Sequence, residues 1–137
     1  MVVTIDWRHF CFFKTMFNKL YAICLLVEDY EKSLVFYRDT LGLRVNSQDT
    51  QYTDFQLGES LFAIFQKDAA TAMFPKKHMS SGSGCVIAFP VENVATACTE
   101  LQARGVAIFA GPKQMPWGQT VAYFKDPDDN ILEITDS

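Results

Sequence analysis

The chain has 137 residues, of which 49% are hydrophobic and 20% charged, as in a single folded domain and unlike a disordered or coiled-coil protein. Its net charge is −4 and its longest basic run is the pair Lys76–Lys77, so nucleic acid is not an expected partner. Its longest uncharged stretch, 78–91, is shorter than the roughly 20 apolar residues of a membrane-spanning helix, so no membrane partner is expected either.

The first seventeen residues lack the regular pattern of the rest of the chain. Their longest apolar run is FCFF, at 10–13, whereas a signal peptide needs an apolar centre of roughly 7–15 residues. We therefore expect residues 1–17 to be an extension or a cloning scar, and residues 18–137 to form one domain. The four cysteines form no CxxC pair and lack histidines at zinc-finger spacing. We expect them to be buried thiols in a soluble, cytoplasmic protein.

Read from Leu20, the chain predicts a strand, a helix and further strands. The apolar run at 20–27 has the length of a strand, and Asp29 follows it as a predicted helix cap. Helical spacing and a closing glycine then appear at Tyr30, Leu34, Tyr37, Leu41 and Gly42. Three short strands are expected to complete this half, at 41–47, 53–60 and 61–67.

The second half repeats this pattern. Val27-Glu28-Asp29 returns 64 positions later as Val91-Glu92-Asn93, which marks an internal duplication. Asn93 is a second predicted helix cap, and the turn residues at 126–130 predict a hairpin between two apolar strands. The segment between the halves, 69–83, contains Pro, Gly and Ser and is expected to be a mobile linker or lid.

The duplicated βαβββ unit, with VEDYEKSLVFYRDTLGL at 27–43 and FKDPDDNILEI at 124–134, resembles the vicinal oxygen chelate superfamily. That superfamily includes glyoxalase I, bleomycin resistance proteins, fosfomycin resistance enzymes and extradiol dioxygenases. The resemblance implies an α+β fold in which two tandem modules, about 18–68 and 84–136, form an open curled mixed sheet with the helices on its outer face. It also implies a homodimer, because such modules commonly complete their clefts across a two-fold axis.

Metal-dependent members of the superfamily place a ligand on the first and the last strand of each module. With the last strands aligned 69 positions apart, the matching positions here are Ala22, Ile64, Val86 and Glu133. Only Glu133 can bind a metal, whereas such a site needs three or four protein ligands. We therefore expect no metal and no other cofactor, and the one further candidate ligand is His78 in the linker, donated within the chain or across a dimer.

Strand alternation turns Ala22, Ile64 and Val86 toward the expected cleft, which makes it apolar. Aromatic side chains are candidates for its walls, although they could instead fill the core: Tyr52, Phe55, Phe62, Phe109, Trp117 and Tyr123. Trp117, between Pro116 and Gly118 on a loop, is a candidate binding residue because its spacing is not that of a core position. Glu133 is interpreted as a counter-charge for a cationic ligand or as a general base, unless it is simply exposed or bonded to a backbone amide.

Two function hypotheses, and a third without ligand chemistry, follow from these residues. The favoured one is metal-independent binding of a cationic or aromatic small molecule, similar to the sequestration of a drug by bleomycin resistance proteins, and hence antibiotic resistance. The alternative is a metal-dependent isomerase like lactoylglutathione lyase, or a dioxygenase, that uses Glu133. The third is a regulatory or assembly role. Whether the protein is an enzyme stays open at this point.

Overall fold

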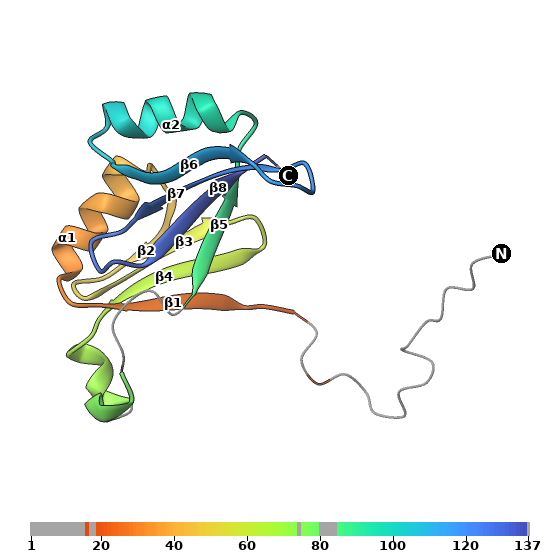
Figure 1. Ribbon diagram of the computed structural model, residues 1–137. Coiled ribbons are helices and arrows are strands. Elements are labelled where there is room, and N and C mark those ends of the chain that lie inside the picture. Colours follow the sequence, from red (N-terminus) through yellow and green to blue (C-terminus); the bar gives the residue numbers. More distant parts are fainter. Residues whose placement is uncertain (1–15, 17–18, 74, 80–84, 137) are drawn as a thin grey trace.

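The computed structural model describes residues 16, 19–73, 75–79 and 85–136, and it contains two four-stranded mixed sheets (Figure 1). The predicted extension lies outside the described residues apart from Met16, so its boundary stays a prediction. The first module consists of β1 (Ala22–Val27), α1 (Tyr30–Leu34), η2 (Val35–Thr40), β2 (Val45–Gln48), β3 (Tyr52–Leu57) and β4 (Ser60–Gln66). The second consists of β5 (Val86–Pro90), α2 (Val94–Ala103), β6 (Ile108–Gln114), β7 (Thr120–Lys125) and β8 (Ile131–Thr135).

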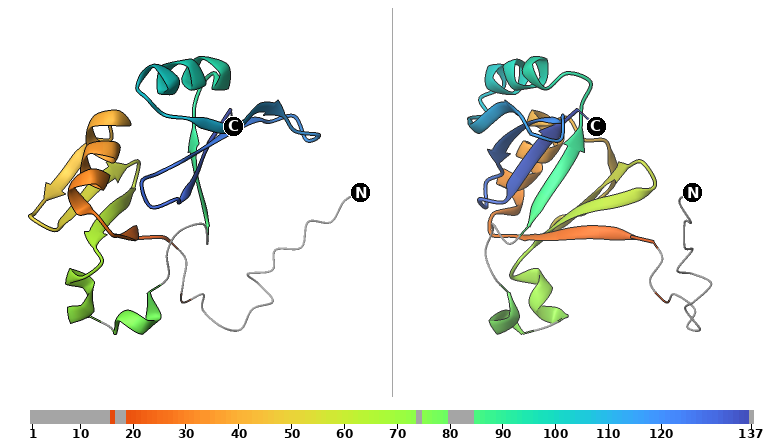
Figure 2. Two further views of the ribbon diagram at one scale, coloured as in Figure 1. Left: turned by 60° about the vertical axis from the view of Figure 1, so that its left-hand side comes forward. Right: turned by 45° about the vertical axis from the view of Figure 1, so that its right-hand side comes forward.

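The two modules have the same topology, which confirms the predicted duplication and the α+β fold. The strand orders are β1-β4-β3-β2 and β5-β8-β7-β6. In each sheet the first strand runs parallel to the last, and the remaining neighbours are antiparallel. Figure 2 shows the two sheets side by side, and β5 is an edge strand of the second sheet.

The predicted caps begin both helices. The side chain of Asp29 accepts a hydrogen bond from the backbone N–H of Lys32 at 3.1 Å, and that of Asn93 accepts one from Thr96 at 2.9 Å. The first helix differs from the prediction, since it widens into a π-type turn over η2, where Leu41 N–H donates to the Phe36 carbonyl oxygen at 2.8 Å. The periodicity of the sequence does not distinguish this wider turn from a regular α-helix.

One core fills the helix-covered faces of both sheets. Its largest fully buried side chains are Tyr37, Phe55, Phe124, Ile64, Leu132 and Val27. Phe55 and Phe62 pack against the Tyr37 ring, with centroids 6.4 and 5.0 Å away. The prediction that Phe55, Phe62 and Ile64 line a cleft is therefore wrong, because these three side chains are 0%, 3% and 0% exposed in the core.

The error at Ile64 comes from the length of one hairpin. Phe55 pairs with Phe62, seven positions on, whereas its counterpart Phe124 pairs with Leu132, eight positions on. The second hairpin is thus one residue longer, and the offset between the modules changes from 69 to 70 across the turn. Because side chains alternate along a strand, a shift of one residue exchanges its two faces. The counterpart of Glu133 is therefore Ala63.

A buried hydrogen-bond network joins the two modules. The hydroxyl of Tyr37 donates to Asp126 Oδ2 at 2.6 Å, and Asp126 Oδ1 accepts from the backbone N–H groups of Asp128 and Asn130 at 2.9 and 2.8 Å. The side chain of Asp128 in turn accepts from the backbone N–H of Glu28 at 3.1 Å. Burial and the neighbouring Asp126 carboxylate raise the pKa of Tyr37. The turn that the sequence predicts as a hairpin therefore also attaches the second module to the first.

Three further expectations concern the linker, the membrane and the cysteines. The described part of the linker forms two short 3-10 turns, Ala69–Ala72 and Lys76–His78, on the side of the first sheet away from α2 (Figure 1). Within the described residues, the helices are too short and too polar to cross a bilayer. The expectation of buried thiols holds for Cys98 and is wrong for Cys24 and Cys85, which are exposed.

Candidate functional site

Each sheet has one face that the core does not use, and we call it the open face. In the second sheet Leu132 and Ile134 point into the core, so Glu133 between them lies on the open face. The strand register places Ala88 of β5 on one side of Glu133 and Tyr123 of β7 on the other. The fold therefore brings two of the predicted site residues, Tyr123 and Glu133, side by side.

Tyr123 and Glu133 form a short hydrogen bond. The tyrosine hydroxyl donates to Glu133 Oε1 at 2.6 Å, and both side chains are half-buried. This hydrogen bond is the main cause that raises the pKa of Tyr123, followed by burial. Among the residues that the structure describes, Glu133 Oε2 accepts no hydrogen bond.

An aromatic surface lies next to this pair. The ring of Phe109, on β6, packs against Tyr123 with centroids 6.2 Å apart and the ring planes tilted by 31°, and Lys125 Nζ lies 5.6 Å from the Phe109 centroid. Phe109 follows Ile108, which packs against the core, so strand alternation places Phe109 on the open face. Phe109 remains 53% exposed, which leaves an apolar surface beside Tyr123, the hydrogen-bond partner of Glu133.

The bend of β6 depends on Gly111. This residue has φ +83°, and a Cβ added there would collide with the carbonyl oxygen of Val121 on β7. Only glycine both adopts this positive φ readily and lacks a Cβ that would collide. Gly111 therefore lets β6 approach β7 closely and turn outward beyond this point. Beyond the bend, the connection to β7 holds Trp117, which is 70% exposed and donates from Nε1 to Gln119 Oε1 at 2.9 Å.

The first sheet has a related pair on its open face, which the sequence reasoning missed. Asp54 of β3 accepts hydrogen bonds from the Tyr52 hydroxyl and from Asn46 Nδ2, both at 2.8 Å, and only 6% of it is exposed. Burial and the bond to Asp54 raise the pKa of Tyr52 to about 12. Asp54 occupies the position equivalent to Tyr123, 69 residues earlier, so the repeat itself was the signal that could have revealed it.

The remaining predicted cleft residues lie on the first strands of the modules. Ala22 is half-buried at the start of β1. Val86 is 53% exposed at the start of β5, two residues before Ala88 and on the same face. Ala22, Tyr52 and Val86 are therefore on open faces as expected, the first two on the first sheet and Val86 on the second.

The described residues of one chain do not fit a divalent metal site. Of the predicted ligand positions, Ala22, Val86 and Ala63, which replaces Ile64, have no donor atom in their side chains, and neither has Ala88, the β5 neighbour of Glu133. Among the described residues, no three His, Cys, Asp or Glu side chains gather closely enough to hold an ion. His78, the further candidate, lies exposed in the second 3-10 turn of the linker.

Comparison with known proteins identifies one matching family and several similar proteins. Residues 20–137 match the family described as Glyoxalase-like domain. Protein YraH of Bacillus subtilis (strain 168) is 32% identical over 123 residues, which are 85% of this chain and 96% of YraH. A probable lactoylglutathione lyase of Synechocystis sp. is 29% identical over 119 residues, or 79% of this chain and 87% of that protein. The crystal structure of a glyoxalase/bleomycin resistance protein/dioxygenase from Nocardioides has a TM-score of 0.78 at 23% identity, covering 90% of this chain and 85% of that one.

Proposed function

Because the chain belongs to the Glyoxalase-like domain family, within the superfamily that its sequence resembles, we propose that it binds a small cationic aromatic molecule without a metal ion. The observation that supports this most is the joint placement of Glu133, Tyr123 and Phe109 on the open face of the second sheet. The carboxylate supplies a counter-charge, and the exposed ring of Phe109 beside Tyr123 supplies an apolar surface on which a ligand ring can lie.

The cationic character of the ligand follows from the electrostatics of this face. A carboxylate oxygen in a half-buried setting attracts a positive group more strongly than it would in water. Lys125 already lies over the Phe109 ring in the manner of a cation–π contact, so the geometry suits a positive group at that ring. A ligand cation would displace the flexible lysine and gain the Glu133 charge as well.

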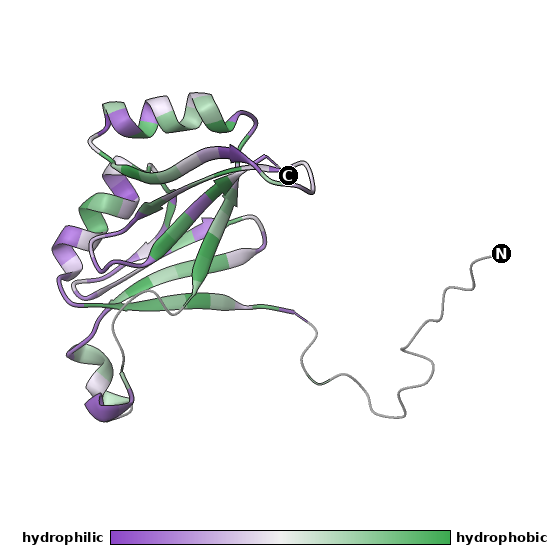
Figure 3. Ribbon diagram, in the orientation of Figure 1, coloured by the Kyte–Doolittle hydropathy of each residue, from purple (hydrophilic) through white to green (hydrophobic). Residues whose placement is uncertain are grey.

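We propose that a second copy of the chain completes this site. Within the described strands, β1 and β5 each have only one neighbour, and Ile23 (39%) on β1, Val86 (53%) on β5 and Tyr21 (79%) just before β1 are exposed. Figure 3 shows both strands as largely hydrophobic along their length. An unpaired apolar edge next to a ligand face favours association, and a homodimer would cover it. Light scattering would give twice the chain mass of 15.5 kDa, and the monomer mass would contradict the proposal.

A lyase or isomerase activity is the second candidate, since a relative at 29% identity is named a probable lactoylglutathione lyase and Glu133 remains in place. The metal of such a reaction would need ligands beyond those that the described part of one chain brings together. The binding proposal does not need them. In a cytoplasmic setting, sequestration of a cationic drug would give resistance to it, which is the physiological role that we favour.

The test compares two ligands with the same ring system, one cationic and one neutral. Isothermal titration of the protein with 1-methylquinolinium and with neutral quinoline should show preferred binding of the cation. Glu133→Gln should abolish that preference, whereas Glu59→Gln, a change of the same kind on an exposed turn, should retain it. Equal binding of the two compounds, or an unchanged preference in Glu133→Gln, would contradict the proposal.

A further inference from the structure

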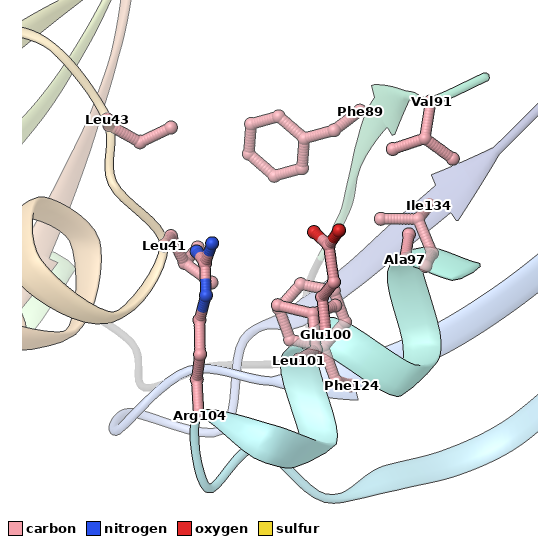
Figure 4. Close-up of a pocket in the computed structure, with 10 residues that line it drawn as sticks. All are labelled: Leu41, Leu43, Phe89, Val91, Ala97, Glu100, Leu101, Arg104, Phe124 and Ile134. Atoms are coloured by element: carbon pink, nitrogen blue, oxygen red, sulfur yellow. The ribbon is translucent and has the colours of Figure 1, made fainter. Parts of the chain in front are cut away.

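A pocket lies between the two modules on the core side of the second sheet, away from both open faces. We call it the junction pocket, and its volume is about 220 Å³. Helix α2 forms its floor, and the segment after η2 faces the end of β5 across it (Figure 4). Most of its lining is apolar and comes from both modules: Leu41, Leu43, Phe89, Val91, Leu101 and Ile134.

Two charged side chains also line this pocket. Glu100 and Arg104 are one helical turn apart on α2, and Figure 4 shows both rising into the space between Leu41 and Phe89. The Arg104 guanidinium donates from one terminal nitrogen to the carbonyl oxygen of Thr40 at 3.0 Å, which fixes it across the junction. Both side chains are partly open to solvent, and within the described residues they form no ion pair with each other.

We propose that the junction pocket binds a zwitterionic amino acid with an aromatic or branched apolar side chain. The apolar lining takes the side chain, the ligand carboxylate pairs with the guanidinium of Arg104, and the ligand ammonium pairs with Glu100. A carboxylate without an amine would face the like charge of Glu100, and an amine without a carboxylate would face that of Arg104. Only a molecule with both groups side by side satisfies the two charges together.

The size of the pocket supports this class of ligand. An apolar cavity of roughly 150 Å³ is known to bind benzene, so about 220 Å³ holds one ring and a short polar group. Larger drugs need pockets of roughly 300–1,000 Å³. The pocket uses neither Glu133 nor Tyr123, so its ligand and that of the open face are independent, and either proposal can fail without the other.

Protein-observed NMR with L-phenylalanine tests the proposal. Saturable shifts are expected at the amides of Leu41, Leu43 and Ala97, which lie on both sides of the pocket. 3-Phenylpropionate and 2-phenylethylamine, which each carry one of the two charges, should bind at least about tenfold more weakly. Absence of shifts up to about 10 mM ligand, shifts confined to an open face, or equal binding of the three compounds would overturn the proposal.

Charge variants locate the contacts. Glu100→Gln and Arg104→Gln should each weaken L-phenylalanine binding at least about tenfold, because each removes one charge-assisted contact. Glu92→Gln and Arg44→Gln remove the same charges at exposed positions outside the pocket and should leave the affinity unchanged. Ala97→Phe, which fills the pocket, should abolish the shifts. If the two pocket variants bind as the controls do, the proposal is wrong.

Discussion

The hydrogen bond between Tyr37 and Asp126 is expected to hold the two modules together, and Tyr37→Phe tests it with the smallest possible change. The Tyr37 ring is 0% exposed, and its hydroxyl donates to Asp126 Oδ2 at 2.6 Å. Asp126 Oδ2 retains one other donor, Asn130 Nδ2 at 2.9 Å, so the carboxylate loses a partner without becoming wholly unpaired. A hydrogen bond to a charged group contributes about 1.5–3 kcal/mol. For a chain of this length that loss lowers the melting temperature by roughly 5–10 °C.

Thermal unfolding followed by circular dichroism measures this difference. The matched control is Tyr21→Phe, which removes the same hydroxyl from a residue that is 79% exposed, and it should change the free energy of unfolding by less than about 0.5 kcal/mol. Equal melting temperatures of the two variants would refute the reasoning, because the buried bond would then contribute nothing beyond an exposed hydroxyl.

The same residue predicts how stability depends on pH. The folded state raises the pKa of Tyr37, whereas an unfolded tyrosine ionises near 10. Above that pH the unfolded chain releases a proton that the folded chain keeps, so the stability due to Tyr37 is fully present below about pH 10 and is lost as the pH rises further. The wild type should therefore lose about 1.4 kcal/mol per pH unit more than Tyr37→Phe in this range. Parallel curves for the two proteins would contradict the assignment.

Three further changes test the placement of residues in the sheets. Ile64→Ala should cost about 2–5 kcal/mol by opening a cavity in the core, while Leu61→Ala on the half-buried open face should cost less, as measured by urea unfolding. Gly111→Ala should destabilise by more than about 1 kcal/mol, because its φ and the Val121 carbonyl both exclude a Cβ, whereas Gly118→Ala, with open space around it, should cost less. Asp54→Asn should lower the pKa of Tyr52 from about 12 toward its ordinary value without reaching it, since burial also contributes, and an unchanged ultraviolet titration would argue against the Tyr52–Asp54 bond.

Local patterns in the sequence predict most of this fold, because they depend on neighbours along the chain. The caps at Asp29 and Asn93 and the turn at 126–130 follow from side chains that bond to nearby backbone, and the duplication is visible in the letters. It is harder to predict which residues of the last strands correspond between the two modules, because this depends on the number of residues in each turn. That count placed Glu133 correctly and Ile64 wrongly.

The candidate site was harder to predict, because its parts lie far apart in the sequence. Tyr123 and Glu133 were both expected at the site, yet their direct bond depends on the pairing of β7 with β8. Asp54 was missed because a polar residue in an alternating strand has the pattern of a solvent-facing position, whereas here the curl of the sheet, Asn46 and Tyr52 enclose it. The junction pocket could not be predicted from the sequence either, because it forms only where the two modules meet.

The extra residue in the second hairpin has a consequence for how the two halves could diverge after duplication. The two hairpins differ by one residue, yet Ile64 and Ile134 both face the core, because the apolar alternation of each strand determines which of its faces is buried. A turn can therefore gain or lose a codon while the open face keeps its residues, and the acid at 133 has Ala63 as its counterpart. Deleting one residue from 126–130 should shorten the turn and leave Glu133 on the open face. In a repeated fold of this kind, each copy can change the length of its turns and the side chains of its open face separately.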